Sequence, residues 1–161
     1  MRILIAALLI AVTGPAVAAQ GWDTYLNDRY GYQIAVPPGF IGQGEPDAHD
    51  GQVFRSRDGT QTLRVWGGYL VDTDFGADIK SRMDDLTQKH WTVTYQATTP
   101  DWASYSGTKG QRVIYVREIS GCKGQQYATF ELEYSSIGIG KLKPVIDKLV
   151  PSLMQKVCTD Y

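Results

Sequence analysis

Histidine and cysteine are scarce in this chain, which removes most of the side chains that nucleophilic catalysis and zinc binding need. Two histidines and two cysteines occur among its 161 residues. No Gly-x-Ser-x-Gly elbow, zinc-type ligand spacing, P-loop or dinucleotide-binding fingerprint is present. The sequence therefore predicts no catalytic residue and no cofactor, and an enzyme such as a hydrolase is the least favoured kind of function.

A surplus of charge of one sign is also missing. The chain has 16 Lys and Arg residues against 17 Asp and Glu residues. Such a weak balance argues against a nucleic-acid binder and against a protein held on a membrane surface by a polybasic patch. We therefore expect no nucleic-acid partner.

Long apolar runs are absent except at the N-terminus. Ile3–Val12 follows the positive charge of Arg2 and precedes the small residues Ala16-Val17-Ala18. This pattern is typical of a secretory signal peptide and is too short for a membrane anchor. We expect residues 1–19 to be a signal peptide and residues 20–161 to form a single α+β domain. That domain would be periplasmic or secreted, with no transmembrane span after cleavage.

Both cysteines, Cys122 and Cys158, lie in the part predicted to be exported. An even count in an oxidising compartment favours a disulfide. The strand after Cys122 should run away from its turn and the last helix should return antiparallel to it, which brings Cys158 near that turn. The alternative, a reactive thiol pair, lacks the C-x-x-C spacing and a flanking base.

Three strand-like segments in the second half predict an antiparallel meander. They are rich in β-branched and aromatic residues and are separated by short glycine-bounded turns. The segments are Trp102–Ser106, Arg112–Ile119 and Gln126–Tyr134.

The middle segment carries apolar residues on both faces, which predicts a central strand with material packed on each side. The last segment alternates instead, with Ala128, Phe130, Leu132 and Tyr134 on a buried face and Tyr127, Thr129, Glu131 and Glu133 on a solvent face. A turn centred on Cys122 would place Ile114 opposite Phe130 and Val116 opposite Ala128.

The rest of the chain supplies more strands and two helices. Asp58-Gly59 between Gln52–Arg57 and Thr60–Trp66 indicates a hairpin. The first helix presents one apolar face and can be N-capped by Asp74 or Asp78; the residues of that face are Phe75, Ile79, Met83 and Leu86. The second helix is expected from about residue 140 to residue 156, kinked or split by Pro151. The fold class is therefore α+β, with a mostly antiparallel sheet, two main helices and one disulfide.

At the level of motifs the chain resembles the PsbP/Mog1-like α/β/α sandwich group, and within it small exported bacterial proteins. The resemblance depends on Tyr30-Gly31-Tyr32-Gln33-Ile34-Ala35-Val36-Pro37, the Asp58-Gly59 hairpin, and a helix that follows a long meander. It spans most of the exported part and implies the sandwich fold and export. These motifs are structural, so the resemblance implies no catalytic residue.

Two sets of side chains are candidates for binding. The acids Asp72, Asp74 and Asp78 offer carboxylates to a hard cation, but helix capping is the simpler interpretation, and we predict no metal site. Five aromatic residues at strand ends or on outer faces could form a binding surface. They are Trp66, Tyr69, Trp102, Tyr105 and Tyr127.

Three kinds of function stay open. The favoured one is a non-enzymatic protein-binding accessory module that contacts another envelope protein, which predicts an exposed aromatic patch rather than a deep cavity. The alternative is a small-ligand or glycan-binding periplasmic protein, which predicts a concave pocket with converging polar groups. A hydrolase would gather titratable residues with perturbed pKa values in a cleft.

Overall fold

The computed structural model describes residues 21–137 and 139–158, so the predicted signal peptide lies outside the described residues. The helices are α1 (Phe75–Gln88), α2 (Ile139–Ser152) and the short 3-10 helix η1 (Cys122–Gly124). The strands are β1 (Asp23–Asn27), β2 (Tyr32–Val36), β3 (Phe40–Gly42), β4 (Gly51–Ser56), β5 (Thr62–Tyr69), β6 (Thr92–Thr98), β7 (Trp102–Lys109), β8 (Arg112–Gly121), β9 (Gln126–Ser135) and β10 (Met154–Gln155).

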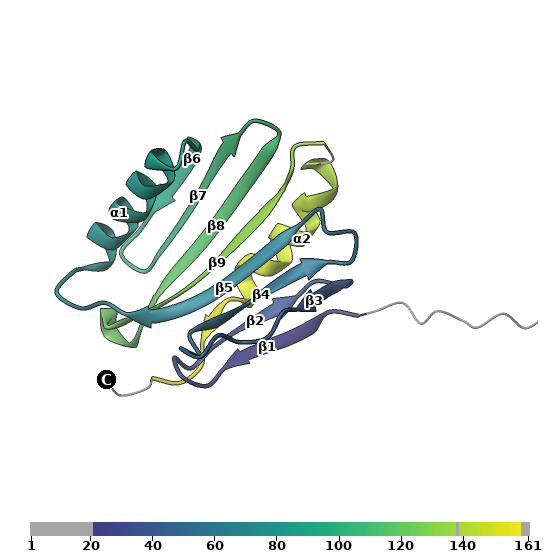
Figure 1. The fold of residues 1–161 in the computed structure, drawn as a ribbon. Helices are drawn as coiled ribbons and strands as arrows, with labels where there is room; N and C mark the ends of the chain where they lie inside the picture. The colour runs from purple at the N-terminus through teal and green to yellow at the C-terminus, as the bar shows by residue number, and fades with distance from the viewer. Residues whose placement is uncertain (1–20, 138, 159–161) are drawn as a thin grey trace, which may run out of the picture.

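Two antiparallel sheets and two α-helices make up the described fold (Figure 1). The larger sheet has seven strands in the order β3-β4-β5-β9-β8-β7-β6, and the smaller has three in the order β1-β2-β10. The predicted α+β class with a mostly antiparallel sheet is confirmed. Among the described residues, no helix is long and apolar enough to cross a membrane.

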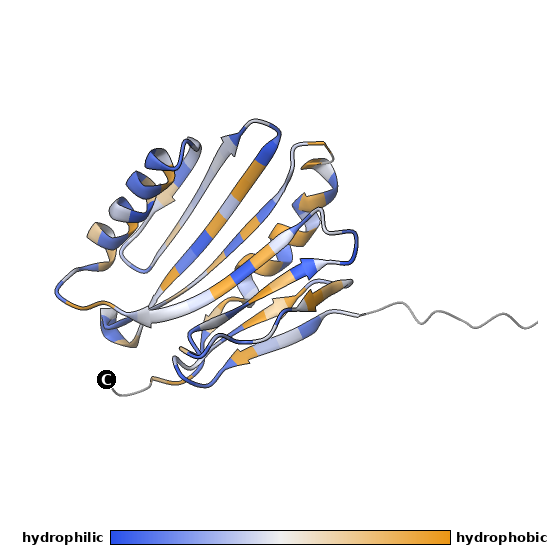
Figure 2. Cartoon of the chain, in the orientation of Figure 1, coloured by the Kyte–Doolittle hydropathy of each residue, from blue (hydrophilic) through white to orange (hydrophobic). Residues whose placement is uncertain are grey.

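The seven-stranded sheet has a hydrophobic core on each face. On one face α1 packs over β7 and β8, with Ile79 1% and Ile114 2% exposed. On the other face α2 and the small sheet pack over β5, β8 and β9, with Phe130 and Leu149 fully buried. The alternation of hydrophobic and hydrophilic residues along β5, β8 and β9 is visible in Figure 2. The sheet is therefore the middle layer of a three-layer sandwich.

The predicted central strand is confirmed, but the predicted register of its hairpin was wrong. β8 lies between β7 and β9, yet Ile114 pairs with Glu133 and Val116 with Glu131 instead of with Phe130 and Ala128. Because side chains alternate along a strand, this shift by an odd number of residues exchanges the faces. Ile114 and Val116 therefore lie under α1, on the same face as the two glutamates.

The cause of the register error is the turn between β8 and β9. Pairing continues as far as Gly121 with Gln126, and the connection is η1 rather than a turn centred on Cys122. Cys122, Lys123 and Gly124 have φ angles of 53°, 59° and 83°. Three successive residues in the left-handed region close the hairpin in a way that residue types alone do not reveal, because only glycine favours that region.

The face of β9 predicted to be in solvent is also partly covered. Thr129 is fully buried, and the side chain of Glu131 is 19% exposed. The prediction of a solvent face was therefore wrong for this part of the strand, because the sequence pattern contains no information about the helix that packs beside it.

The first helix and the Asp58-Gly59 hairpin follow their local signals. Asp74 is the N-cap of α1, and its Oδ1 accepts a hydrogen bond of 2.8 Å from the backbone N–H of Ala77. The Asp58-Gly59 hairpin is confirmed between β4 and β5. Gly59 has a φ of 69°, and Asp58 accepts hydrogen bonds from Ser56 and Thr60.

The second helix ends earlier than predicted. α2 stops at Ser152, directly after Pro151, and the chain then forms β10. Met154 and Gln155 pair with Gln33 and Tyr32 of β2. The apolar pattern of the sequence extends past the helix end, because Leu153 is also buried, at 4% exposed. This pattern made the predicted helix too long.

The predicted disulfide is confirmed. Cys122 and Cys158 are bonded, with their Cα atoms 5.4 Å apart and 36 residues apart in sequence. The bond joins the β8–β9 turn to the segment that follows β10. Next to it, the backbone N–H groups of Lys156 and Val157 both donate to the carbonyl of Gly31, at 2.7 and 3.0 Å.

Replacing both cysteines, as Cys122→Ser with Cys158→Ser, should lower the free energy of unfolding by about 3–4 kcal/mol, because the loop is no longer closed in the unfolded chain. Urea denaturation measures this difference. A reducing agent should weaken the wild type similarly and leave the double variant unchanged. Equal midpoints for wild type and double variant would contradict the prediction.

Candidate functional site

The most distinctive uncovered surface lies beside α1, on the same face of the seven-stranded sheet. The pairing of Arg64 with Glu131 and of Glu131 with Val116 places these side chains in one row across β5, β9 and β8. Val116 is covered by α1, whereas the side chain of Arg64 is 39% exposed. We call the partly exposed region beside α1, made of Val53, Arg64, Trp66 and Glu131, the Trp66 surface.

Trp66 stands between two hollows in this surface. One has a volume of about 470 Å³ and lies between β4, β5 and the chain from Gln43 to Gly51. The other, of about 110 Å³, lies between α1 and the sheet, where Arg82 and Glu131 also line it. The indole is half-buried, so its ring forms part of the wall of both hollows.

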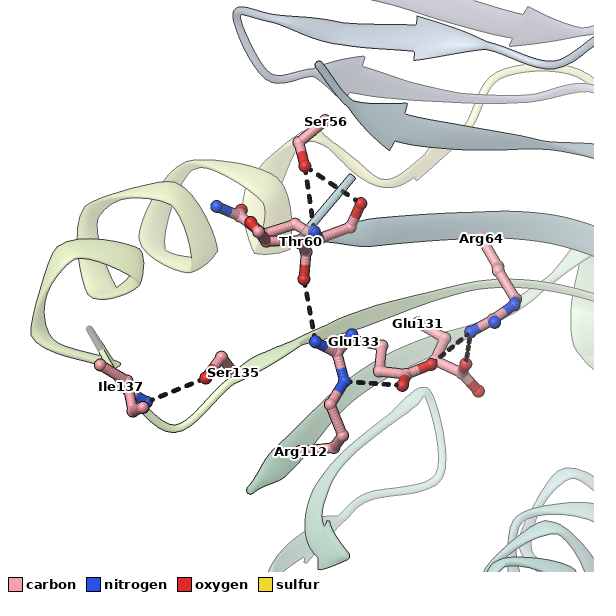
Figure 3. Close-up of polar contacts among 9 residues, drawn as sticks. Ser56, Thr60, Arg64, Arg112, Glu131, Glu133, Ser135 and Ile137 are labelled. Carbon is pink, nitrogen blue, oxygen red and sulfur yellow. Dashed lines mark hydrogen bonds and ion pairs between the residues drawn. The ribbon is translucent and has the colours of Figure 1, made fainter. Parts of the chain in front are cut away.

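An ionic network fixes the polar side of the Trp66 surface (Figure 3). Nη1 of Arg64 bonds to Glu131 and lies 3.2 Å from Oε2 of Glu133. Nε of Arg112 donates to Oε1 of Glu133 at 3.0 Å, and its Nη1 donates to the carbonyl of Thr60 at 2.9 Å. Two cations and two carboxylates from three strands thus hold one another in place, which orients Arg64 beside Trp66.

The two glutamates of this network respond differently to their surroundings. Burial raises the pKa of Glu131, and Arg64 offsets only part of that effect. Burial also acts to raise the pKa of Glu133, but the hydrogen bonds from Arg112 and Arg64 outweigh it, so this pKa lies below its usual range.

A second polar cluster is buried beneath α1. Glu118 is 0% exposed, and its Oε2 lies 3.3 Å from Nε of Arg82. Nε of Arg82 donates to Oδ2 of Asp78 at 2.7 Å, and the guanidinium lies 4.4 Å above the ring of Tyr127. Neither oxygen of Glu118 has a hydrogen-bond partner among the described residues. The guanidinium of Arg82 therefore lies beside two carboxyl groups, and of these only Asp78 accepts a hydrogen bond from it.

The environment of Glu118 favours its neutral form. Burial, which is the largest effect, raises its pKa to about 8; Arg82 acts in the opposite direction and Asp78 raises the pKa again. At neutral pH this carboxyl group holds its proton in the folded protein. Because the side chain is not exposed, it is not placed to meet a substrate.

One feature of the sequence could have indicated this buried cluster. Arg117 and Glu118 are adjacent charged residues inside an otherwise apolar stretch. Adjacent residues of a strand point to opposite faces, so one charge had to enter each side of the sandwich. Sequence reasoning missed Arg82, Glu118 and the network of Arg64, because the partners come from distant segments.

The five predicted aromatic residues do not form one surface. Trp66, Tyr105 and Tyr127 lie on the α1 side, where Tyr105 is 3% exposed and belongs to the core. Tyr69 and Trp102 lie on the opposite face. The ring of Tyr69 packs edge-on against Tyr30 with centroids 5.2 Å apart, and Trp102 packs under Arg117. Of the five, Trp66 is the one that lines the two hollows.

The three predicted acids of the first helix region have structural partners or lie apart. Asp74 caps α1 and Asp78 pairs with Arg82, while Asp72 precedes the helix with a φ of 55°. Across residues 21–137 and 139–158, no group of three or more His, Cys, Asp or Glu side chains is arranged to hold a metal ion.

Comparison with solved structures identifies the fold. Cyanobacterial PsbP (CyanoP) from Synechocystis is similar with a TM-score of 0.63 and 16% identity, over 89% of this chain and 97% of that chain. The Ran-binding protein Mog1p from Saccharomyces cerevisiae gives a TM-score of 0.63 and 14% identity, over 85% and 96%. A point mutant of Mog1 gives 0.62 and 13%, over 84% and 96%.

These similarities confirm the predicted PsbP/Mog1-like fold, and at such identities they establish the fold alone. No protein-family model matches the chain, and no curated protein does.

The buried carboxyl group yields a prediction about pH. The folded protein keeps the proton of Glu118 up to about pH 8, whereas the unfolded chain releases it near the ordinary glutamate pKa of 4.5. Between these values the folded state binds more protons, so the free energy of unfolding falls as pH rises. Near pH 4.5 the free energy of unfolding of Glu118→Gln should match that of the wild type. At pH 8 it should exceed that of the wild type by on the order of 2–4 kcal/mol.

Chemical denaturation of both proteins across this pH range measures the difference. The control is Asp84→Asn, because Asp84 is 58% exposed and pairs with Lys80 on the surface of α1; its curve should run parallel to that of the wild type. A constant difference between Glu118→Gln and the wild type at all pH values would contradict the assignment.

Proposed function

We propose that this chain of PsbP/Mog1 fold is a non-enzymatic protein-binding accessory module of the bacterial envelope, and that the Trp66 surface contacts its partner. The observation that carries the proposal is a half-buried tryptophan set between two hollows on a partly exposed region of the sheet. A partner can insert side chains on both sides of the indole, which is the arrangement of an interface anchor.

The neighbours of Trp66 suit this role. Tryptophan and arginine are the residues most enriched at the energetic centres of protein interfaces. Arg64 is held by Glu131 and Glu133, so a partner would bind it with little loss of side-chain entropy. Val53 stands beside Arg64 in the pairing of β4 with β5 and adds apolar area.

Two further findings support the proposal. One solved neighbour, Mog1p, is itself named as a Ran-binding protein, which shows that this fold can serve protein binding. The disulfide is compatible with an oxidising compartment outside the cytoplasm. Together with the N-terminal pattern typical of a signal peptide, it supports export, and the partner would then be another envelope protein.

A small-ligand or glycan-binding role is the second candidate. The hollow of about 470 Å³ beside Trp66 lies within the range of small-molecule sites, and carboxylate, amide and indole groups line it. A hydrolase receives no such support, because the carboxyl group with the most strongly raised pKa, Glu118, is fully buried.

Site-specific photo-cross-linking in the producing cells tests the protein-binding role. A benzophenone amino acid in place of Val53 should give a discrete cross-linked product, because this residue lies on the Trp66 surface. The same amino acid in place of Lys143 on α2, whose side chain is 77% exposed, should give none. Adding Trp66→Ala should reduce the Val53 product about tenfold or more, as expected for an anchor residue.

Two readouts accompany that experiment. Circular dichroism verifies that Trp66→Ala is folded, and native mass spectrometry of the purified protein detects a bound small molecule. No product at Val53, together with a bound molecule that Trp66→Ala loses, would reject the protein-binding role in favour of the ligand-binding one. Equal products from Val53 and Lys143 would also reject the Trp66 surface as the contact.

A further inference from the structure

Arg117 lies on the other face of the sheet from the Trp66 surface. Across β6, β7 and β8, Ala97, Ser104 and Arg117 stand in one row, and Tyr95, Ser106 and Tyr115 stand in the next. The hydrophobic core beneath α2 reaches Tyr115 but includes no described residue of β6 or β7. This end of the face is therefore outside the core, and Tyr95 is 51% exposed on it.

The guanidinium of Arg117 is held in a defined position. It lies 4.1 Å from the centre of the Trp102 ring, and its Nη1 donates to Oγ of Ser104 at 3.1 Å. The hydroxyl of Tyr115 donates to the same oxygen at 3.2 Å. The Oγ of Ser104, which is 4% exposed, thus accepts two hydrogen bonds, and neither of them uses its own proton.

Among residues 21–137 and 139–158, this cation has no anionic partner. The other half-buried arginines all pair with carboxylates, Arg64 and Arg112 with Glu133 and Arg82 with Asp78. Arg117 makes no ion pair with any described residue, and its Nε is buried without a hydrogen-bond acceptor. Burial lowers the pKa of Arg117, and the titratable groups that act on it are Tyr115 and Tyr95 rather than acids.

We propose that Arg117, Ser104 and Trp102 form a binding site for a carboxylate-bearing ligand. A carboxylate matches the fork of N–H donors on a guanidinium and supplies the missing negative charge. Ala97 and Ser106, which stand in these two rows, have small side chains, and Tyr95 adds an exposed aromatic ring on the same face. The ligand is therefore a carboxylate attached to an apolar or aromatic group. The site is separate from the Trp66 surface and does not depend on the function proposed for it.

The side-chain Nε–Hε signal of Arg117 in a ¹⁵N NMR spectrum of the wild-type protein is the most direct readout. Phenylacetate is the probe for a free organic acid, and the dipeptide Gly-Phe is the probe for a peptide C-terminus. Each has a neutral control of nearly the same shape, phenylacetamide and Gly-Phe amide. Ionic strength is kept constant with chloride.

A saturable shift of the Arg117 signal with phenylacetate, with Gly-Phe or with both is the expected result. Affinity for the matching amides should be weaker by about tenfold or more, since a charge-assisted bidentate contact is lost. The probe that binds more tightly shows whether the ligand of this site is a free organic acid or the C-terminus of a peptide. No saturable shift with either carboxylate, equal shifts with the amides, or tighter binding of inorganic phosphate would overturn the proposal.

A variant separates binding at Arg117 from general attraction to a cationic surface. Arg117→Gln should abolish the shifts that phenylacetate causes in the backbone signals of β7 and β8. Arg55→Gln removes an exposed arginine of β4 and should leave them unchanged. Shifts that persist in Arg117→Gln, with its backbone spectrum otherwise that of the folded wild type, would also overturn the proposal.

Discussion

The register between β8 and β9 is the constraint on which the rest of the structure depends. Side chains alternate between the two faces of a strand, so one register decision assigns every residue of both strands to a layer. Because Gly121 pairs with Gln126, Ile114 and Val116 face α1 while Phe130 and Leu132 face α2. The η1 turn that sets this register is also where Cys122 anchors the segment after β10.

The same register separates the two adjacent charges of β8. Glu118 enters the α1 layer, where it shares Arg82 with Asp78, and its carboxyl group is favoured in the neutral form. Arg117 enters the opposite side, where an aromatic ring and a serine contact it and no acid of the described part of the chain pairs with it. Removing a polar group from water without full hydrogen bonding costs free energy, so hydrophobic packing alone does not account for either residue.

Two arrangements of charged side chains on the sheet thus differ in whether the charges are paired within the protein. The network of Arg64, Arg112, Glu131 and Glu133 is internally neutral, and it serves to orient side chains beside Trp66. Arg117 has no such network. This difference is why we assign contact with a protein to the first surface and recognition of a charged group to the second position. A shared fold with PsbP and Mog1p leaves both assignments open, because function depends on the side chains that a fold displays.

The sequence by itself determined the fold class, the central place of β8, the cap at Asp74, the Asp58-Gly59 hairpin and the disulfide, because each depends on residue types close together in the chain or on a count of two cysteines. It did not determine the register after Cys122, the end of α2 at Ser152, or the partners of Arg64, Arg82 and Arg117. Those depend on left-handed backbone angles, on pairing with β2, and on which distant segment covers each face. Local periodicity specifies which residues of a strand share a face, and only the tertiary structure decides what that face meets.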